Sequence, residues 1–520
     1  MIDLSRTRAD LLAEIAAPEP TVELLDDITD PRVVSADACV RVHGHTRDDL
    51  FPLLEAALSE RYPAVPRSQL ILDLLMPLRN ALGNAFKHGN GQDRAKAVHV
   101  EMVLSRKGAL IAVTDEGKGF DVGLTFRRFQ EQEIYFDNQG DGFRNLHRAT
   151  SAVTYENGGR TFLLCFQPSM GEAGGVANPF RVPRSGPAGD SAEAPALRNV
   201  VDSQWIRTRL LAELPDFGNG RTKLESCRVY GARKLGGDNR GIRCVLRIAD
   251  HDDRPARTQV LTGTLHGDEA TATAAFEAAT ALYRAKATHS LRIPRPVAQL
   301  TDERRLVLYD FDPWMNLWEY LAYHPDLVTV QHAANRAGRA LGVLHRSKVV
   351  LRDGEPDFVE EPRQAIISAA ERKLECLPRG SDLLDRFRFS VQRIQAQARP
   401  GLPKTSVPIH GSLGWDCIHY GVDNRFYLYG FETCRRSDPG LDLGGFAADL
   451  LCLMLARWDK DAYRSCRDEF LSSYTSIADH PMDPEDLRPY VALAVSERLR
   501  RAGSLTTDCA ERLLDVLDAA

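Results

Sequence analysis

The sequence predicts an α+β protein with two parts: helices packed on a mixed sheet, then a strand-rich lobe that leads into a helical lobe. Between residues 69 and 166, an apolar helical period precedes two pairs of alternating strands. Residues 171–199 are rich in Pro, Gly, Ala and Ser and lack apolar periodicity, which is typical of a linker. Beyond the linker, strand patterns dominate as far as residue 310 and helical patterns follow. We therefore expect domains at 1–170, 200–312 and 313–520, with a linker at 171–199.

Composition narrows the class of protein. The 520 residues are 43% hydrophobic and 27% charged, with a net charge of −6, which gives no sign of a nucleic-acid surface. The ten cysteines form no C-x-x-C pair, so neither a zinc site nor a disulfide framework is indicated. The N-terminus lacks the apolar stretch of a signal peptide. The longest apolar run, 443–458, is interrupted by Asp449 and is too short to span a membrane. We expect a cytoplasmic protein.

The helix predicted to end at Gly89 carries the first candidate site. At about 100° per residue, its apolar side chains fall on one side. Four polar side chains fall on the other side, one above the next: Asn80, Asn84, Lys87 and His88. Amide oxygens are hard ligands suited to Mg²⁺, and a lysine is a point charge for phosphate. The alternative is a plain amphipathic helix with a solvated face.

A predicted hairpin carries the second candidate site. Residues 98–104 alternate apolar and polar, Arg106-Lys-Gly108 makes the turn, and 109–114 returns as a strand. Asp115 therefore lies at a strand end. The residues that follow it, Gly117, Gly119 and Phe120, allow the backbone to approach a ligand closely.

A third block follows a stretch without a clean period. Residues 121–139 are polar and aromatic, which is typical of a mobile lid. Gly140 and Gly142 then open a short helix from Phe143 to about Ala149, whose free N–H groups can face phosphate oxygens. Strands at 152–155 and 160–166 follow, joined by an Asn-Gly-Gly turn.

These three blocks, in this order, resemble the N, G1 and G2 boxes of the ATPase superfamily of gyrase, heat-shock chaperones, histidine kinases and mismatch-repair ATPases. The nearest branches are the histidine kinases and the anti-sigma-factor serine kinases. The resemblance implies an α/β sandwich that binds ATP and Mg²⁺. It also implies that Asn84 holds the metal, that Asp115 accepts the adenine amino group, and that Gly117 and Gly119 shape the purine pocket.

Asn80 departs from part of that superfamily. In the anti-sigma serine kinases and the hydrolysing members, this position is a Glu that acts as general base. An amide accepts a proton poorly, and loss of a base lowers a rate by about 10²–10⁴-fold. Histidine kinases also have Asn here, but they place an acceptor histidine on a separate helix pair, and no such pair precedes Asn80. His43 and His45 lie in a strand-like stretch, Cys39 to His43, and we expect them to be loop or edge residues.

The sequence after the linker predicts a defined order of strands and helices. Strands at 227–230 and 242–248 flank a glycine-containing loop, 231–241, and a third strand at 258–265 precedes a helix at 269–285. A strand at 305–310 then leads into the helical lobe, where residues 337–345 continue a helical period. We expect His345 to pack against or cap that helix, and the Arg-rich stretch 497–501 to form a solvated helix face.

Several short motifs in this half resemble the aminoglycoside phosphotransferases, which are kinase-like enzymes. His410-Gly-Ser412 to Cys417 resembles their catalytic loop, and Gly430-Phe-Glu432 resembles their metal-binding turn. Ser412 stands where those enzymes have the catalytic Asp, Cys417 where they have a metal-binding Asn, and Gly430 where they have a metal-binding Asp. The third strand offers no Lys for the phosphates. The resemblance therefore implies a pseudokinase. The alternative is a set of chance matches in another α/β domain.

Three hypotheses about function follow. The first is an ATP-binding signalling protein whose first domain transfers phosphate to Ser or Thr of a protein partner, or hydrolyses ATP slowly, while its second half binds a partner. The second is an ATP-gated binding module without chemistry. The third is an active small-molecule phosphotransferase in the second half. We expect a protein partner and no nucleic acid or membrane, and a homodimer stays open.

Overall fold

The structure is a computed structural model, which divides into two compact units. The first comprises Met1–Gly174 with Pro255–Thr258, and the second comprises Gly175–Arg254 with Gln259–Ala520. The division after Gly174 lies within the segment that composition assigns to a linker. The structure describes residues 2–15, 24–65, 69–130, 151–168, 202–214, 222–236, 239–250, 257–286, 291–300, 305–323, 327–351, 360–397, 406–421, 425–479, 482–501 and 505–520.

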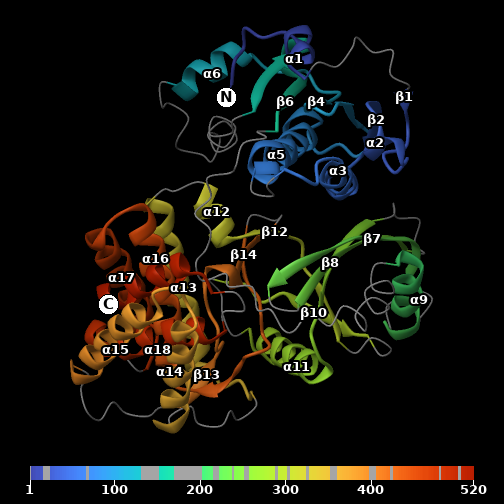
Figure 1. Cartoon of the computed structure of the whole chain (residues 1–520). Coiled ribbons are helices and arrows are strands. Elements are labelled where there is room, and N and C mark those ends of the chain that lie inside the picture. The colour runs from blue at the N-terminus through green and yellow to red at the C-terminus, as the bar shows by residue number, and fades with distance from the viewer. Residues whose placement is uncertain are drawn as a thin grey trace. The chain divides into compact units, whose positions relative to one another are not determined.

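The first unit is built on a six-stranded mixed sheet with the order β1-β2-β3-β4-β6-β5 (Figure 1). Its β1 pairs parallel to β2, and the other pairs are antiparallel. The strands are β1 (Leu24–Leu25), β2 (Ala38–Gly44), β3 (Val98–Leu104), β4 (Ala109–Thr114), β5 (Ala152–Glu156) and β6 (Thr161–Phe166). The helices are α1 (Arg8–Glu14), α2 (Arg32–Ser35), α3 (Arg47–Arg61), α5 (Met76–Asn84) and α6 (Val122–Gln130). The expected helical layer on a mixed sheet is therefore present.

Helices cover both faces of this sheet. On one face, α5 packs against β4 and β6, and α3 packs beside α5. On the other, Leu11 in the middle of α1 and Ile15 just beyond its end pack on Val103, Leu110 and Leu163. Because neighbouring strand residues point to opposite faces, Leu110 contributes to the α1 side while the next residue faces the other layer. The sheet is therefore a buried central layer, not an open platform.

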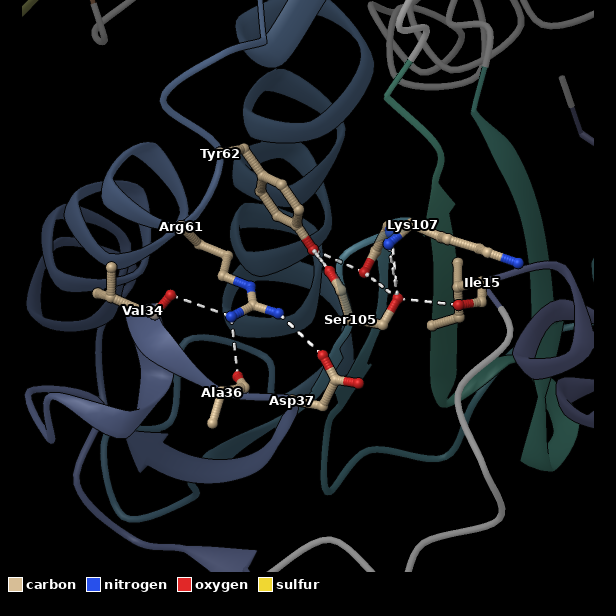
Figure 2. Close-up of polar contacts among 9 residues, drawn as sticks. Ile15, Val34, Ala36, Asp37, Arg61, Tyr62, Ser105 and Lys107 are labelled. Atoms are coloured by element: carbon tan, nitrogen blue, oxygen red, sulfur yellow. Dashed lines mark hydrogen bonds and ion pairs between the residues drawn. The ribbon is translucent and has the colours of Figure 1, made fainter.

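The C-terminal end of α3 ties three segments together (Figure 2). Tyr62 donates from its hydroxyl to the carbonyl oxygens of Ser105 and Gly108, at 3.2 and 2.6 Å. Ser105 Oγ in turn donates to the carbonyl oxygen of Ile15 at 2.8 Å, and Arg61 donates to the carbonyl oxygens of Val34 and Ala36. These bonds fix the β3–β4 turn between the ends of α1 and α3, so the hairpin that leads to Asp115 is held at its far end.

The second unit contains a five-stranded sheet of order β10-β11-β9-β8-β7, in which the pairs β10–β11, β11–β9 and β7–β8 are antiparallel. Its strands are β7 (Thr222–Gly236), β8 (Asn239–Asp250), β9 (Arg257–Leu265), β10 (Arg295–Gln299) and β11 (Leu306–Asp310). Helix α9 (Ser203–Glu213) packs on one face and α11 (Glu269–Ala285) on the other. The helix predicted at 269–285 is confirmed at both ends. The predicted loop 231–241 is wrong, because β7 and β8 continue through most of it as a long hairpin.

The rest of the second unit is mainly helical. Its helices are α12 (Leu317–Tyr323), α13 (Leu327–Arg346), α14 (Glu360–Glu375), α15 (Gly380–Gln397), α16 (Pro439–Arg457), α17 (Lys460–Thr475), α18 (Pro484–Arg501) and α19 (Thr507–Ala519). Two small sheets, β12 (Pro313–Asn316) with β14 (Ile418–Gly421) and β15 (Phe426–Leu428), and β13 (Val407–Ile409) with β16 (Arg435–Ser437), carry the loops of interest. Of the described helices, only α16 is long and apolar enough to cross a membrane, and 78% of its most apolar window is buried within the protein, as in a core helix.

Two local expectations are corrected. The stretch after Asp121, expected to lack periodic structure, begins with α6, because the Asp121 side chain accepts the Leu124 N–H at 2.8 Å and caps the helix. The stretch 497–501, expected to be a solvated helix face, is partly internal. Leu499 is buried, and the Arg498 guanidinium pairs at 2.6 Å with the buried carboxylate of Asp449.

Candidate functional site

The helix with the four polar residues is one continuous segment of three pieces. A π-helical turn, η1 (Leu70–Leu75), leads into α5, and a second π-helical turn, η2 (Ala85–Gly89), ends it. Its apolar side is buried. On the other side Asn80 is half-buried and three side chains are exposed, namely Asn84, Lys87 and His88. The predicted faces are confirmed. The π turns were not predicted, and such turns are frequent at functional sites.

Asp115 lies directly against the end of this helix. It follows the last residue of β4, and its N–H donates to the carbonyl oxygen of Arg160 at 3.1 Å. Its carboxylate accepts the N–H of Gly117 at 2.8 Å, and a β-carbon built at Gly89 would lie only 2.2 Å from its Cγ. Burial raises the pKa of Asp115, while the Gly117 N–H and the charges of Arg160 and Lys96 oppose that rise. The structure thus brings the first two predicted blocks together.

The glycines after Asp115 are required by the protein's own packing. A β-carbon at Gly117 would lie 2.1 Å from the carbonyl oxygen of Gly89. Gly119 has φ of +74°, and its β-carbon would lie 2.1 Å from the carbonyl oxygen of Gly158. Phe120 is 40% exposed and its ring meets Tyr155 edge-on at 5.5 Å. Through these contacts the loop packs tightly between the helix end and the β5–β6 turn. The third block, Gly140, Gly142 and Phe143, lies outside the described residues.

The structure adds two polar residues that the sequence patterns did not single out. Thr161 begins β6 opposite Thr114 of β4, and their hydroxyl oxygens lie 3.0 Å apart. Asn90 is only 3% exposed, and its side chain hydrogen-bonds to Ala97, just before β3, and to Glu116, just after Asp115. Thr161 lies two residues after the glycine turn, and Asn90 follows Gly89. Their adjacency to the blocks is the only signal that could have found them.

The candidate site of the second unit, around His410, lies in a loop whose backbone is held by a buried carboxylate. The carboxylate of Asp442, at the start of α16, accepts the N–H groups of His410 and Gly411, each at 2.7 Å. His345 lies 3.1 Å from the same carboxylate. Burial opposes ionisation of Asp442, but the hydrogen bond and charge of His345, aided by His410, hold its pKa below the usual range. The earlier expectation that His345 packs or caps its helix is refined: it is a buried partner of Asp442.

The side chains of Ser412 and Cys417 make polar contacts within this region, whereas the side chain of Asp416 is exposed. Ser412 Oγ lies 2.8 Å from Thr433 Oγ1, and Cys417 Sγ lies 3.3 Å from the carbonyl oxygen of Ser412. Burial raises the pKa of the Cys417 thiol well above its usual range, so the thiol stays neutral. Gly430 has φ of +89°, and a β-carbon there would lie 3.9 Å from Glu432 Oε2. In the described part of the chain, no three His, Cys, Asp or Glu side chains are grouped to hold a metal ion.

A side-chain bridge joins the third strand of the sheet to this loop region. Thr264 of β9 hydrogen-bonds through its hydroxyl to the hydroxyl of Tyr429, the residue before Gly430. The Tyr429 ring meets Tyr309 of β11 edge-on at 5.2 Å, and both tyrosines are at most 9% exposed. The strand and the turn are therefore in direct contact through buried aromatic side chains.

Comparisons with known proteins give a likeness of structure only. No family model and no curated protein sequence matches the chain. Among solved structures, it is similar to a choline/ethanolamine kinase family protein from Mesorhizobium loti, with 16% identity over 61% of this chain and 99% of that one and a TM-score of 0.35. It is also similar to a choline kinase from Streptococcus pneumoniae (13% identity, 61% and 99% covered, TM-score 0.38). A third is a macrolide 2'-phosphotransferase from Brachybacterium faecium (16%, 59% and 98%, 0.37). These identities and scores transfer no substrate or activity to the chain.

Proposed function

We propose that the first unit binds Mg²⁺·ATP. The observation that carries this proposal is the packing of the Asp115 carboxylate against Gly89, at the end of the helix that presents Asn84 and Lys87. A half-buried carboxylate suits the amino group of a purine, an exposed amide oxygen suits Mg²⁺, and the lysine suits phosphate. The donor set fits the ligand, and it lies along one helix end and one loop of the same unit.

The chemistry after binding depends on a group other than Asn80. Its amide neither takes a proton nor gives one usefully, so the first unit lacks a base at the position where the serine kinases have one. We propose a signalling role in a cytoplasmic protein, in which the γ-phosphoryl group of ATP is transferred to a Ser or Thr hydroxyl of a protein partner, the hydroxyl proton passes to solvent and ADP leaves, or in which ATP is hydrolysed slowly. The competing role is ATP-gated partner binding without transfer, and the amide at position 80 favours it.

We propose that the second unit is a kinase-like binding domain without phosphotransfer. In kinases, the third strand carries a Lys and the metal-binding turn carries an Asp, and the nucleotide phosphates lie between them. Here Thr264 and Tyr429 bridge these two elements directly, and both charged groups are missing. The competing role is an active small-molecule phosphotransferase, which would need Glu432 and Asp416 to replace the missing ligands.

Calorimetry on the full chain tests the ATP site. Wild type should bind Mg²⁺·ATP; Asn84→Ala should lose the part of the affinity that depends on Mg²⁺; and Asp115→Ala should weaken binding of ATP with and without the metal. Loss of a charged, partly buried hydrogen bond corresponds to about 1–3 kcal/mol, or roughly 10–100-fold in Kd. Lys107→Ala, in the exposed turn at the far end of the hairpin, is the matched control and should bind normally. Unchanged affinity in both site variants would reject the assignment.

Labelled ATP separates the proposed roles. Incubation with the γ-labelled nucleotide should give acid-stable label on Ser or Thr of a partner protein, and Asn84→Ala should abolish it. Wild-type binding without any transfer or hydrolysis would favour the ATP-gated role. Label on a small molecule that survives Asn84→Ala would assign the activity to the second unit.

A further inference from the structure

Asn90 joins the two halves of the candidate nucleotide site. It is the residue after η2 and donates its N–H to the carbonyl oxygen of Ala85 at 2.7 Å, so it closes the last π-helical turn. Asn90 is only 3% exposed. The position is therefore internal, although it follows directly on the exposed pair Lys87 and His88.

Both the NH₂ group and the oxygen of the Asn90 side-chain amide form hydrogen bonds. Nδ2 donates to the carbonyl oxygen of Ala97, the residue before β3, at 3.0 Å. Oδ1 accepts the N–H of Glu116, the residue after Asp115, at 2.8 Å. Only an amide matches this pattern, because a carboxylate offers no donor to Ala97 and a hydroxyl is too short to reach both partners.

The helix end and the loop that this amide joins approach each other more closely than side chains at Gly89 and Gly117 would allow. Gly117 lies against the carbonyl oxygen of Gly89, and Gly89 lies against the Asp115 carboxylate. Where Gly89 and Gly117 meet, neither residue has a side chain that could hold the helix end and the loop apart. The Asn90 amide is thus a direct polar tie between the helix end that carries Asn84 and the loop that carries Asp115.

We propose that Asn90 is a positioning residue that sets the distance between the metal-binding and base-binding sides of the nucleotide site. The inference rests on the proposed function of the first unit. Asn90 touches no ligand in this proposal; it acts through Glu116 and the helix end. A shift of Asp115 relative to Asn84 would let ATP keep either its metal contacts or its base contacts, but not both.

The test uses the full chain and two substitutions. Asn90→Leu is nearly isosteric and removes both bonds, whereas Asn90→Asp keeps the acceptor for Glu116 N–H and loses the donor to Ala97. Hydrogen exchange should show the Glu116 amide exchanging at least tenfold faster in Asn90→Leu, and much less so in Asn90→Asp. The preference for ATP over GTP should fall at least tenfold in Asn90→Leu and should be partly restored in Asn90→Asp. Arg94→Ala, exposed in the same loop, should change neither readout.

The outcomes separate the two proposals. Preserved discrimination between ATP and GTP in Asn90→Leu, measured well below its unfolding temperature, would limit Asn90 to a structural role and overturn the inference. Absence of nucleotide binding by wild type would overturn the proposed function instead, while the Glu116 exchange result would still report the tie itself. A variant too unstable to assay is replaced by Asn90→Asp, whose retained bond keeps the comparison with wild type interpretable.

Discussion

At the scale of single residues, side-chain chemistry was predictable where a pattern put like residues on one face. Asn84 and Lys87 were placed on the exposed side of the helix by periodicity alone, and the structure agrees. Asn90 was not predictable, because its role depends on Ala97 and Glu116, which the chain brings to it only through a hairpin. A single polar residue after a helix end gives no periodic signal.

Asp449 was noticed in the sequence only as an interruption of an apolar run. The structure makes it a buried group of the α16 core, 2% exposed, that accepts the Trp415 N–H and pairs with Arg498. Burial raises its pKa from 3.8 to about 6, and the Arg498 charge only partly offsets that effect. The folded state therefore binds this proton more tightly than the unfolded chain does.

The sign of the pH effect follows from linkage. A raised folded-state pKa contributes stability that is present below the unfolded value and is lost as pH rises through about 6. We expect this loss to be on the order of 2–3 kcal/mol for wild type between pH 4 and 7, and to be absent from Asp449→Asn. Denaturant unfolding at several pH values measures it. Asp461→Asn, whose side chain is 85% exposed, is the control and should parallel wild type. A pH-independent difference between wild type and Asp449→Asn would contradict the prediction.

At the scale of secondary-structure elements, periodicity predicted whether a segment is a helix or a strand better than it predicted where the segment begins and ends. Helix α11 agrees at both ends because Asp268 caps its start and its alanine face is regular. The loop expected at 231–241 is wrong, because cross-strand pairing between β7 and β8 overrides the turn preference of its glycines. The π-helical turns on either side of α5 have no signature in the order of apolar residues.

Two glycines on the helix that carries Asn84 make a matched pair for a test. A β-carbon at Gly89 would displace the Asp115 carboxylate, which can rotate away without unfolding the unit. A β-carbon at Gly83 would meet nothing nearer than 3.9 Å. Gly83→Ala should therefore keep nucleotide affinity and add up to about 1 kcal/mol of stability from helix propensity. Gly89→Ala should lose at least tenfold in affinity with a smaller change in stability. Calorimetry and thermal unfolding of both variants decide it, and equal affinities would show that Asp115 does not contact the ligand.

At the scale of the whole molecule, the sequence supported two folded parts and an order of elements in each. It could not show that Thr264 of the third strand hydrogen-bonds to Tyr429, next to the 430–432 turn. These two residues lie 165 residues apart, and neither belongs to a motif. The residue types at Ser412, Cys417 and Gly430 were readable from the sequence, whereas this bridge was not.

The nucleotide site proposed for the first unit makes a prediction that can be mapped along the sequence. At 100 times Kd, a ligand that binds only the folded state stabilises it by about 2.7 kcal/mol. Hydrogen exchange of the full chain with saturating Mg²⁺·ATP should therefore show increased protection in residues 76–90 and 109–120. Residues 260–265 and 410–433 should be unchanged, because the Thr264–Tyr429 bridge is already closed without nucleotide. Asn84→Ala should abolish the protection in the first unit. Protection of 410–433 that persists in Asn84→Ala, and disappears in Glu432→Gln, would mean that the second unit is a working nucleotide site.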